Sequence, residues 1–209
     1  MNLLIENIRS DDALGRARSE AFLLENPDDG VRLRPEGQLA RAVESGQGLI
    51  ISQDASICGI SLVYAYDPGD DEKVAYEIGT MRITAAGYRL QEFLAKLHIF
   101  QITLEDDITR GDIFAVVSPG TASHHNLETH AGMAEWHPDT LLAMMRRDAG
   151  VPFDPAKLVL RADDGVIARA FADLKSWHIA DNRFRTPKGA GEIALGMGWF
   201  HPDLLNVGA

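Results

Sequence analysis

The most informative segment of the sequence, residues 76–94, reads YEIGTMRITAAGYRLQEFL. Its first part belongs to a strand that we expect over residues 74–84. Ala85, Ala86 and Gly87 follow as a turn of small residues. Apolar residues then recur at helical spacing and predict a long helix from about Gly87: Leu90, Phe93, Leu94, Leu97, Phe100 and Leu104. A helix start behind small residues offers unpaired amides and a partial positive charge, so this turn favours phosphate binding.

The flanking segments predict a sheet with helices around it. Before the segment, we expect an apolar piece at 3–8, a helix starting at 10–12, a helix over 35–46, and strands at 49–52 and 57–66. After it, we expect a strand at 113–117, a helix from Ser118 and Pro119 to Gly132, a helix over 138–148, and a hairpin of 157–162 with 166–171 around Asp164 and Gly165. A helix between two strands gives a parallel crossover, whereas hairpins give antiparallel neighbours. The expected fold class is α/β with a mixed, mostly antiparallel sheet.

Composition limits the classes of function. The 209 residues are 45% hydrophobic and 24% charged, as in an ordinary globular protein of one large domain or a domain with an extension. The longest apolar runs have five residues, which predicts no membrane anchor, and the start lacks an export signal, so we expect a cytoplasmic protein. The net charge of −11 argues against nucleic acid as a partner. Cys58 is the only cysteine and is interpreted as a buried thiol, not a nucleophile.

A second segment, residues 114–133, reads FAVVSPGTASHHNLETHAGM. With the order of elements, the two segments resemble the GNAT superfamily of N-acetyltransferases, which transfer an acyl group from acyl-coenzyme A to an amine. The resemblance implies that 76–94 form the family's fourth strand, phosphate loop and following helix, and that 114–133 form its fifth strand and fourth helix. It covers roughly residues 1–133. We therefore expect a GNAT-like core at 1–133 and a C-terminal extension at 134–209 that completes the sheet and offers a surface for a homodimer.

The resemblance also implies a reaction and its residues. The cosubstrate is acetyl-CoA, and the acceptor is a small-molecule amine that reacts directly in a ternary complex. The expected cofactor-binding residues are Met81, Arg82, Ile83, Ala86, Gly87, Tyr88, Arg89, Leu90, Ser118, Thr121 and Asn126. Glu77, on the family's catalytic strand, is the first candidate for the base that deprotonates the amine. His124 is the second candidate, and Glu128 stands where a tyrosine commonly protonates the leaving thiolate.

Departures from the family pattern keep other interpretations open. The loop retains one glycine, Glu128 replaces the tyrosine, and Thr121 replaces a common asparagine. A noncatalytic ligand-binding or protein-interaction module is therefore the alternative function, and a hydrolase using Ser118 or Ser123 with a histidine is a third hypothesis. For Glu77 the alternative role is a structural salt bridge, and for His124 it is a surface imidazole.

The histidines at 124, 125 and 130 are spaced by one, five and six residues. A metal-binding pair on one helix face needs a spacing of about four. We therefore expect no metal site.

Overall fold

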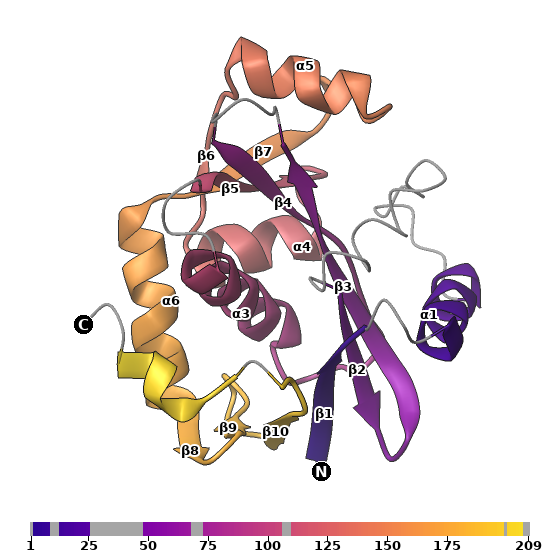
Figure 1. Ribbon diagram of the computed structural model, residues 1–209, viewed down its shortest axis with the longest axis vertical. Helices are drawn as coiled ribbons and strands as arrows, with labels where there is room; N and C mark the ends of the chain where they lie inside the picture. The colour runs from indigo at the N-terminus through magenta and orange to yellow at the C-terminus, as the bar shows by residue number, and fades with distance from the viewer. Residues whose placement is uncertain are drawn as a thin grey trace.

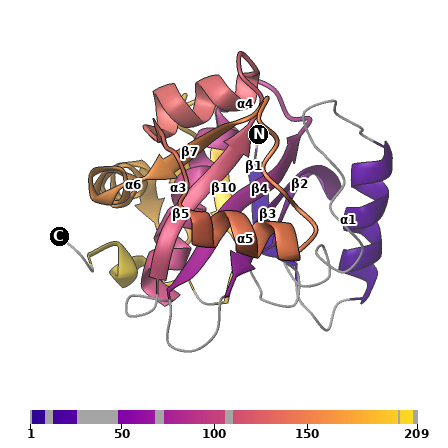
Figure 2. The ribbon, with the colours of Figure 1, turned by 90° about the horizontal axis from the view of Figure 1, so that it is seen from above.

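The computed structural model describes residues 2–8, 13–25, 48–67, 73–105, 110–198 and 200–206, which form a ten-stranded sheet with helices on both faces (Figures 1 and 2). The strands are β1 (Asn2–Asn7), β2 (Leu49–Gln53), β3 (Ser56–Tyr66), β4 (Val74–Ile83), β5 (Arg110–Val117), β6 (Ala134–Glu135), β7 (Leu158–Ala162), β8 (His178–Ala180), β9 (Arg183–Arg185) and β10 (Glu192–Leu195). The α-helices are α1 (Ala13–Glu25), α3 (Leu90–Glu105), α4 (Ala122–His125), α5 (Thr140–Asp148) and α6 (Asp164–Trp177). A π-helix, η1 (Asn126–Ala131), continues α4, and a short 3-10 helix, η2 (Pro202–Asn206), lies near the C-terminus.

The strands follow one another across the sheet in the order β6-β7-β5-β4-β3-β2-β1-β10-β9-β8. β4 pairs with β5 and β1 pairs with β10 in parallel, and the other described neighbours pair antiparallel. The prediction of a mixed, mostly antiparallel sheet is therefore confirmed. Residues after Met133 supply strands to both edges, with β6 and β7 on the β5 side and β8, β9 and β10 on the β1 side.

Helix α3 joins β4 to β5 and is buried along most of its length. Figure 1 shows it between the sheet and α6. Phe93 and Phe100 pack in a cluster with Leu174 of α6, and Ile99 packs in a second cluster with Ala170. Because the sheet and α6 cover both sides of α3, its polar residues Lys96, His98 and Gln101 are buried as well.

The opposite face of the sheet carries α1 and α5. Phe22 of α1 and Leu142 of α5 pack in a third cluster with Tyr66 of β3 and Phe114 of β5. Figures 1 and 2 show α1 across the sheet from α3 and α6. Residues 76–78 alternate between the two faces, so that Tyr76 and Ile78 face α3 and Glu77 faces α5.

Two local predictions are wrong. The expected hairpin around Asp164 and Gly165 is instead the strand β7 followed by α6, since the side chain of Asp163 caps the helix by accepting from the Val166 amide at 2.8 Å. The expected helix start at Ser118 and Pro119 is also wrong. These residues belong to a turn, and α4 begins at Ala122.

The other expected elements between residues 49 and 148 are present within a few residues. The expected helix over 35–46 and the helix start at 10–12 lie outside the described residues.

Candidate functional site

The β4–β5 split, formed by residues 78–83 of β4 and 115–117 of β5, is an opening in the sheet. Among the described residues, parallel pairing of the two strands ends at Glu77 and Phe114. Beyond that point β4 stays paired with β3 as far as Ile83, and β5 stays paired with β7 as far as Val117. The facing edges therefore present backbone amides and carbonyls that an extended ligand can pair with.

A bulge distorts β4 along the split. Arg82 pairs with Ile60 and Gly79 pairs with Leu62, so β4 has one more residue than β3 between these pairs. Thr80 lies inside the bulge with a φ of +44°, and its hydroxyl is 2.6 Å from the Tyr64 hydroxyl. A bulge turns backbone groups out of the ladder direction, so this one changes which groups of β4 face the split.

The small-residue turn leads from β4 into α3 at the mouth of the split. Thr84 is the last residue tied to β3, with its amide donating to the Cys58 carbonyl at 2.8 Å. Gly87 has a φ of +91°, and a Cβ added there would meet nothing within 4 Å. Arg89 has a φ of +53°, and its carbonyl accepts from the Phe93 amide at the start of α3. Because β4 and β5 are parallel and α3 connects them, the first-turn amides of α3 lie at the end of the sheet where the split opens.

Helix α4 is tied to the first turn of α3. Gln91 donates from Nε2 to Ser123 Oγ at 3.2 Å and accepts at Oε1 from Asn126 Nδ2 at 2.5 Å. Thr121 caps α4 by accepting from the His124 amide at 3.2 Å. The two helix starts therefore form one unit beside the split. Sequence reasoning missed Gln91, although a polar residue in the first turn of the helix after the small-residue turn was the available signal.

The structure brings the expected cofactor-binding residues to this region. Met81, Arg82 and Ile83 lie in the part of β4 beyond its last residue paired with β5. The next group lies in the turn and at the start of α3: Ala86, Gly87, Tyr88, Arg89 and Leu90. Ser118 directly follows β5, Thr121 caps α4, and Asn126 is the first residue of η1. The Leu90 side chain is only 2% exposed and packs in the core, so only its backbone is available to a ligand.

Glu77 lies at the vertex of the split but faces α5. Glu77 is fully buried, with 0% of its surface exposed. Oε2 accepts from the Tyr66 hydroxyl at 2.7 Å and lies 3.2 Å from Arg146 Nε. The Arg146 guanidinium stacks on Phe153, 4.2 Å from the ring centroid. This candidate base is therefore held in a buried ion pair.

His124 and Glu128 form a separate pair on α4 and η1. His124 Nε2 is 3.5 Å from Glu128 Oε2, and its Nδ1 accepts from the Gly120 amide at 3.2 Å. Glu128 is about half exposed, with 53% of its side chain accessible. The pair lies on the α3 side of the sheet, whereas Glu77 faces α5. The structure does not bring the three candidate catalytic residues together in one cluster.

Among the described residues, His98, His130 and Cys58 have shifted pKa values. Burial lowers the pKa of His98 to about 3, and its Nε2 lies 2.8 Å from Ser61 Oγ. Burial, followed by the positive charge of Arg89, lowers the pKa of His130. Burial raises the pKa of the Cys58 thiol, which disfavours the reactive thiolate.

The hydroxyls proposed for a hydrolase have other partners. Ser118 Oγ accepts from Lys157 Nζ, and Ser123 Oγ accepts from Gln91. A serine nucleophile needs a histidine that can take its proton, and neither of these hydrogen bonds provides one.

A groove of about 640 Å³ lies away from the split, at the opposite end of β5. Its lining includes Gly111 and Asp112 of β5, Leu142 of α5 and Arg161 of β7. Asp112 and Arg161 form an ion pair of 2.8 Å across it. The split lies at the C-terminal ends of β4 and β5, whereas the groove lies at their N-terminal ends, so the groove is not an extension of the split.

Within the described ranges, no group of three or more His, Cys, Asp or Glu side chains is arranged to hold a metal ion. Of the helices that the structure describes, none has the length and apolar character needed to cross a membrane.

Comparison with known proteins supports the fold. No protein-family model and no curated protein sequence matches the chain. Among solved structures, Naa50 of Arabidopsis thaliana with the bisubstrate analogue CoA-Ac-MVNAL has a TM-score of 0.55 and 12% identity, covering 78% of this chain and 99% of that one. A chain of the NatC complex bound to Gag peptide and CoA has a TM-score of 0.54 and 12% identity, and the match covers 77% of this chain and 96% of that one. A GNAT-family acetyltransferase from Streptococcus pneumoniae has a TM-score of 0.51 and 17% identity, covering 76% and 96%. The chain therefore has the fold of the GNAT acetyltransferases.

Proposed function

We propose that the protein is an acyl-CoA-dependent N-acyltransferase that transfers an acetyl group directly to an amine in a ternary complex. The observation that carries the proposal is the β4–β5 split, which opens beside the small-residue turn and the first turn of α3. Amide groups of a pantetheine arm can pair with the free edge of a strand. The diphosphate of the same coenzyme fits the unpaired amides at a helix start.

In this arrangement the parts of the coenzyme are assigned to different residues. The diphosphate lies over Gly87, where the structure leaves open space, and contacts the Arg89 guanidinium. The pantetheine follows residues 81–83 of β4. The thioester then reaches the vertex of the split, near the last paired residues, Glu77 and Phe114.

The chemistry requires one proton to leave the amine and one to reach the thiolate. The amine nitrogen attacks the thioester carbonyl carbon, a C–N bond forms, and the C–S bond breaks as the thiolate leaves. Glu77 is proposed as the base that accepts the amine proton, with Arg146 neutralising its charge in the resting protein. His124, oriented by Glu128, is proposed as the group that supplies a proton on the thiolate side.

Isothermal titration of acetyl-CoA into the purified protein tests the coenzyme step. We expect saturable binding, with comparable binding of desulfo-CoA, which keeps the diphosphate and the pantetheine arm apart from its thiol. No detectable heat at millimolar acetyl-CoA would remove the main support for the proposal.

A noncatalytic module with the same fold is the second candidate. Its support is the complete burial of Glu77 between Tyr66 and Arg146. Thiol release from acetyl-CoA with a broad panel of amines discriminates the two functions, because reproducible turnover excludes a purely binding role. Coenzyme binding without turnover across the panel would favour the module.

A further inference from the structure

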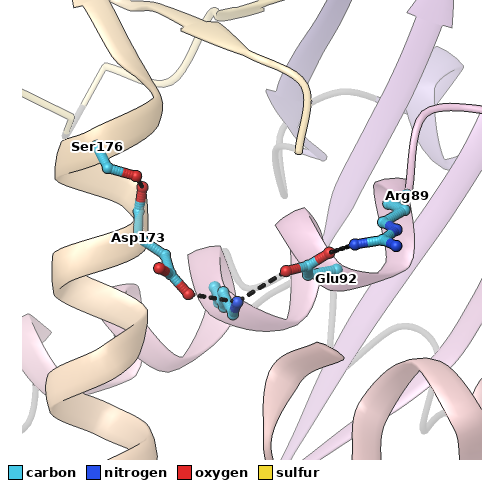
Figure 3. A network of polar contacts seen from close by, with 5 residues as sticks. Arg89, Glu92, Asp173 and Ser176 are labelled. Carbon is cyan, nitrogen blue, oxygen red and sulfur yellow. Dashed lines mark hydrogen bonds and ion pairs between the residues drawn. The ribbon is translucent and has the colours of Figure 1, made fainter. Parts of the chain in front are cut away.

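Four charged side chains form a continuous chain of contacts from the turn before α3 to α6 (Figure 3). At its centre, Lys96 Nζ donates to Glu92 Oε1 at 2.9 Å and to Asp173 Oδ2 at 2.5 Å. The same ammonium group lies 4.9 Å from the centroid of the Trp177 ring. Only 2% of the Lys96 side chain is exposed, so it is a buried cation held by carboxylates from two helices.

The two oxygens of Glu92 have different surroundings. Oε1 accepts from Lys96, whereas Oε2 is buried without a hydrogen-bond partner among the described residues. Oε2 lies 3.8 Å from Arg89 Nη1, which is too long for a hydrogen bond. Figure 3 shows Glu92 with Arg89 on one side and the contacts that lead to Asp173 on the other. Arg89 is therefore only loosely held by Glu92.

Arg89 lies where an anionic ligand would bind. Its side chain is 40% exposed, and it directly precedes the first turn of α3. A carboxylate in the same turn would oppose binding of a diphosphate in two ways. It would repel the ligand, and it would compete for the Arg89 guanidinium.

We infer that Lys96 is a positioning residue for the diphosphate of the coenzyme, because it neutralises Glu92 and keeps that carboxylate from closing on Arg89. Asp173 fixes Lys96 from the other side, so α6 contributes to the coenzyme site without touching the ligand. The inference rests on the proposed function. The inference adds to that function two residues, Lys96 and Asp173, that lie behind the surface where the coenzyme would bind.

The test compares a phosphate-bearing ligand with a phosphate-free one. Binding of CoA and of pantetheine is measured for the wild type, Lys96→Met, Glu92→Gln and the double variant. We expect Lys96→Met to weaken CoA binding by about tenfold, because the Glu92 charge is no longer neutralised. The double variant should return to within about threefold of the wild type, because the opposing charge is gone as well. Pantetheine affinity should change by less than about twofold throughout, because it carries no phosphate.

If Lys96→Met fails to fold, Glu92→Gln provides a second test. In this variant Lys96 is unchanged and keeps its ion pair with Asp173. CoA affinity should then be unchanged or up to about threefold tighter. Weaker binding of CoA by Glu92→Gln would overturn the inference, as would an equal loss of CoA and pantetheine affinity in Lys96→Met. Unchanged CoA binding in a folded Lys96→Met would also overturn it and leave the proposed function standing. A wild-type protein that binds no CoA would remove both.

Discussion

Two buried carboxylates, one on each face of the sheet, are paired in different ways. Glu77 faces α5, is 0% exposed, and has the Tyr66 hydroxyl and the Arg146 guanidinium beside the same oxygen. Glu92 lies in the first turn of α3, on the other face of the sheet; one of its oxygens pairs with Lys96, and the other lies toward Arg89. The first network is closed within the core, whereas the second ends at an exposed turn. Of the two networks, only that of Glu92 reaches an exposed cationic side chain, Arg89.

The largest expected effect comes from opening the closed network. Arg146→Met leaves the Glu77 charge buried without its cation, which typically costs about 3–5 kcal/mol. The free energy of unfolding from urea titration should fall by that amount. The double variant Arg146→Met with Glu77→Gln should recover most of the loss.

The neighbouring Arg147 provides the matched control, since 64% of its side chain is exposed and its partner is Asp148. Arg147→Met should change the free energy of unfolding by less than about 1 kcal/mol. If Arg146→Met is no less stable than this control, the Glu77 network is not the closed, charged unit described above.

Glu77 of the closed network is also the proposed base for the amine. Glu77→Gln keeps the shape of the side chain but cannot take a proton from the amine. We expect turnover to fall by about 100-fold. CoA affinity should stay within about twofold, because Glu77 faces away from the phosphate turn.

Glu135 on β6 is an exposed acid and gives the control variant Glu135→Gln. Its turnover should match that of the wild type. An unchanged rate in Glu77→Gln would assign Glu77 to stability alone and leave the α3 side as the functional one.

A negative charge added beside Arg89 tests the network that ends at the exposed turn. Gly87→Asp places a carboxylate over the turn, next to the loosely held Arg89. We expect CoA affinity to fall by at least about tenfold. Stability should fall by about 1 kcal/mol, because a φ of +91° disfavours any residue with a Cβ.

Gly189 is a matched control. It also has a positive φ, +67°, and a Cβ added there meets nothing within 4 Å, but it lies in the turn between β9 and β10. Gly189→Asp should lose similar stability and keep its CoA affinity. Equal losses of affinity in both variants would show that backbone strain, not charge at the turn, causes the effect.

The smallest effect concerns a buried polar group that carries no charge. The pKa of His98 is lowered to about 3 by burial, against an ordinary value of 6.5, so the unfolded chain binds a proton below pH 6.5 that the native protein does not. Stability is therefore fully present above about pH 6.5 and is lost as pH falls toward 3. Between pH 7 and pH 5.5 we expect a loss of about 1 kcal/mol from this residue.

The pH dependence is measured as the free energy of unfolding of the wild type and His98→Gln at both pH values. His98→Gln should lose less stability on acidification, whatever its stability at pH 7. His137→Gln, at an exposed position, should keep the wild-type pH dependence. If His98→Gln loses as much stability as the wild type between pH 7 and pH 5.5, other groups cause the loss of stability in acid.

Local patterns were enough to predict the part of the fold around the split. Strands β2 to β5 and helix α3 follow from alternating or helical apolar spacing. Helix α6 was missed because Asp164 and Gly165 are typical of a turn, and the capping role of Asp163 depends on where the chain goes next. The expected phosphate-turn residues lie together before and at the start of α3 for the same local reason, since a turn and the helix after it are adjacent in sequence.

The charge networks could not be predicted in this way. Arg146 meets Glu77 from 69 residues away, and Asp173 meets Lys96 from 77 residues away. Such pairs depend on how α5 and α6 pack on the sheet, which spacing along the chain does not specify. The resemblance placed Glu77 on the family's catalytic strand, and a structural salt bridge was its alternative role. Spacing along the chain could not identify Arg146 as the partner in that ion pair.

The parallel pairing of β1 with β10 has a consequence for how the chain folds. Leu3 of β1 pairs with Ile193 of β10. Figure 1 shows these two strands near each other, although they lie far apart in the sequence and must therefore find each other during folding. Contacts of such long sequence separation form slowly, because a large loop must close first. Until β10 arrives, β1 exposes an unpaired strand edge that can pair with another chain. Synthesis of this protein therefore passes through a period of aggregation risk that lasts until β10 has paired with β1.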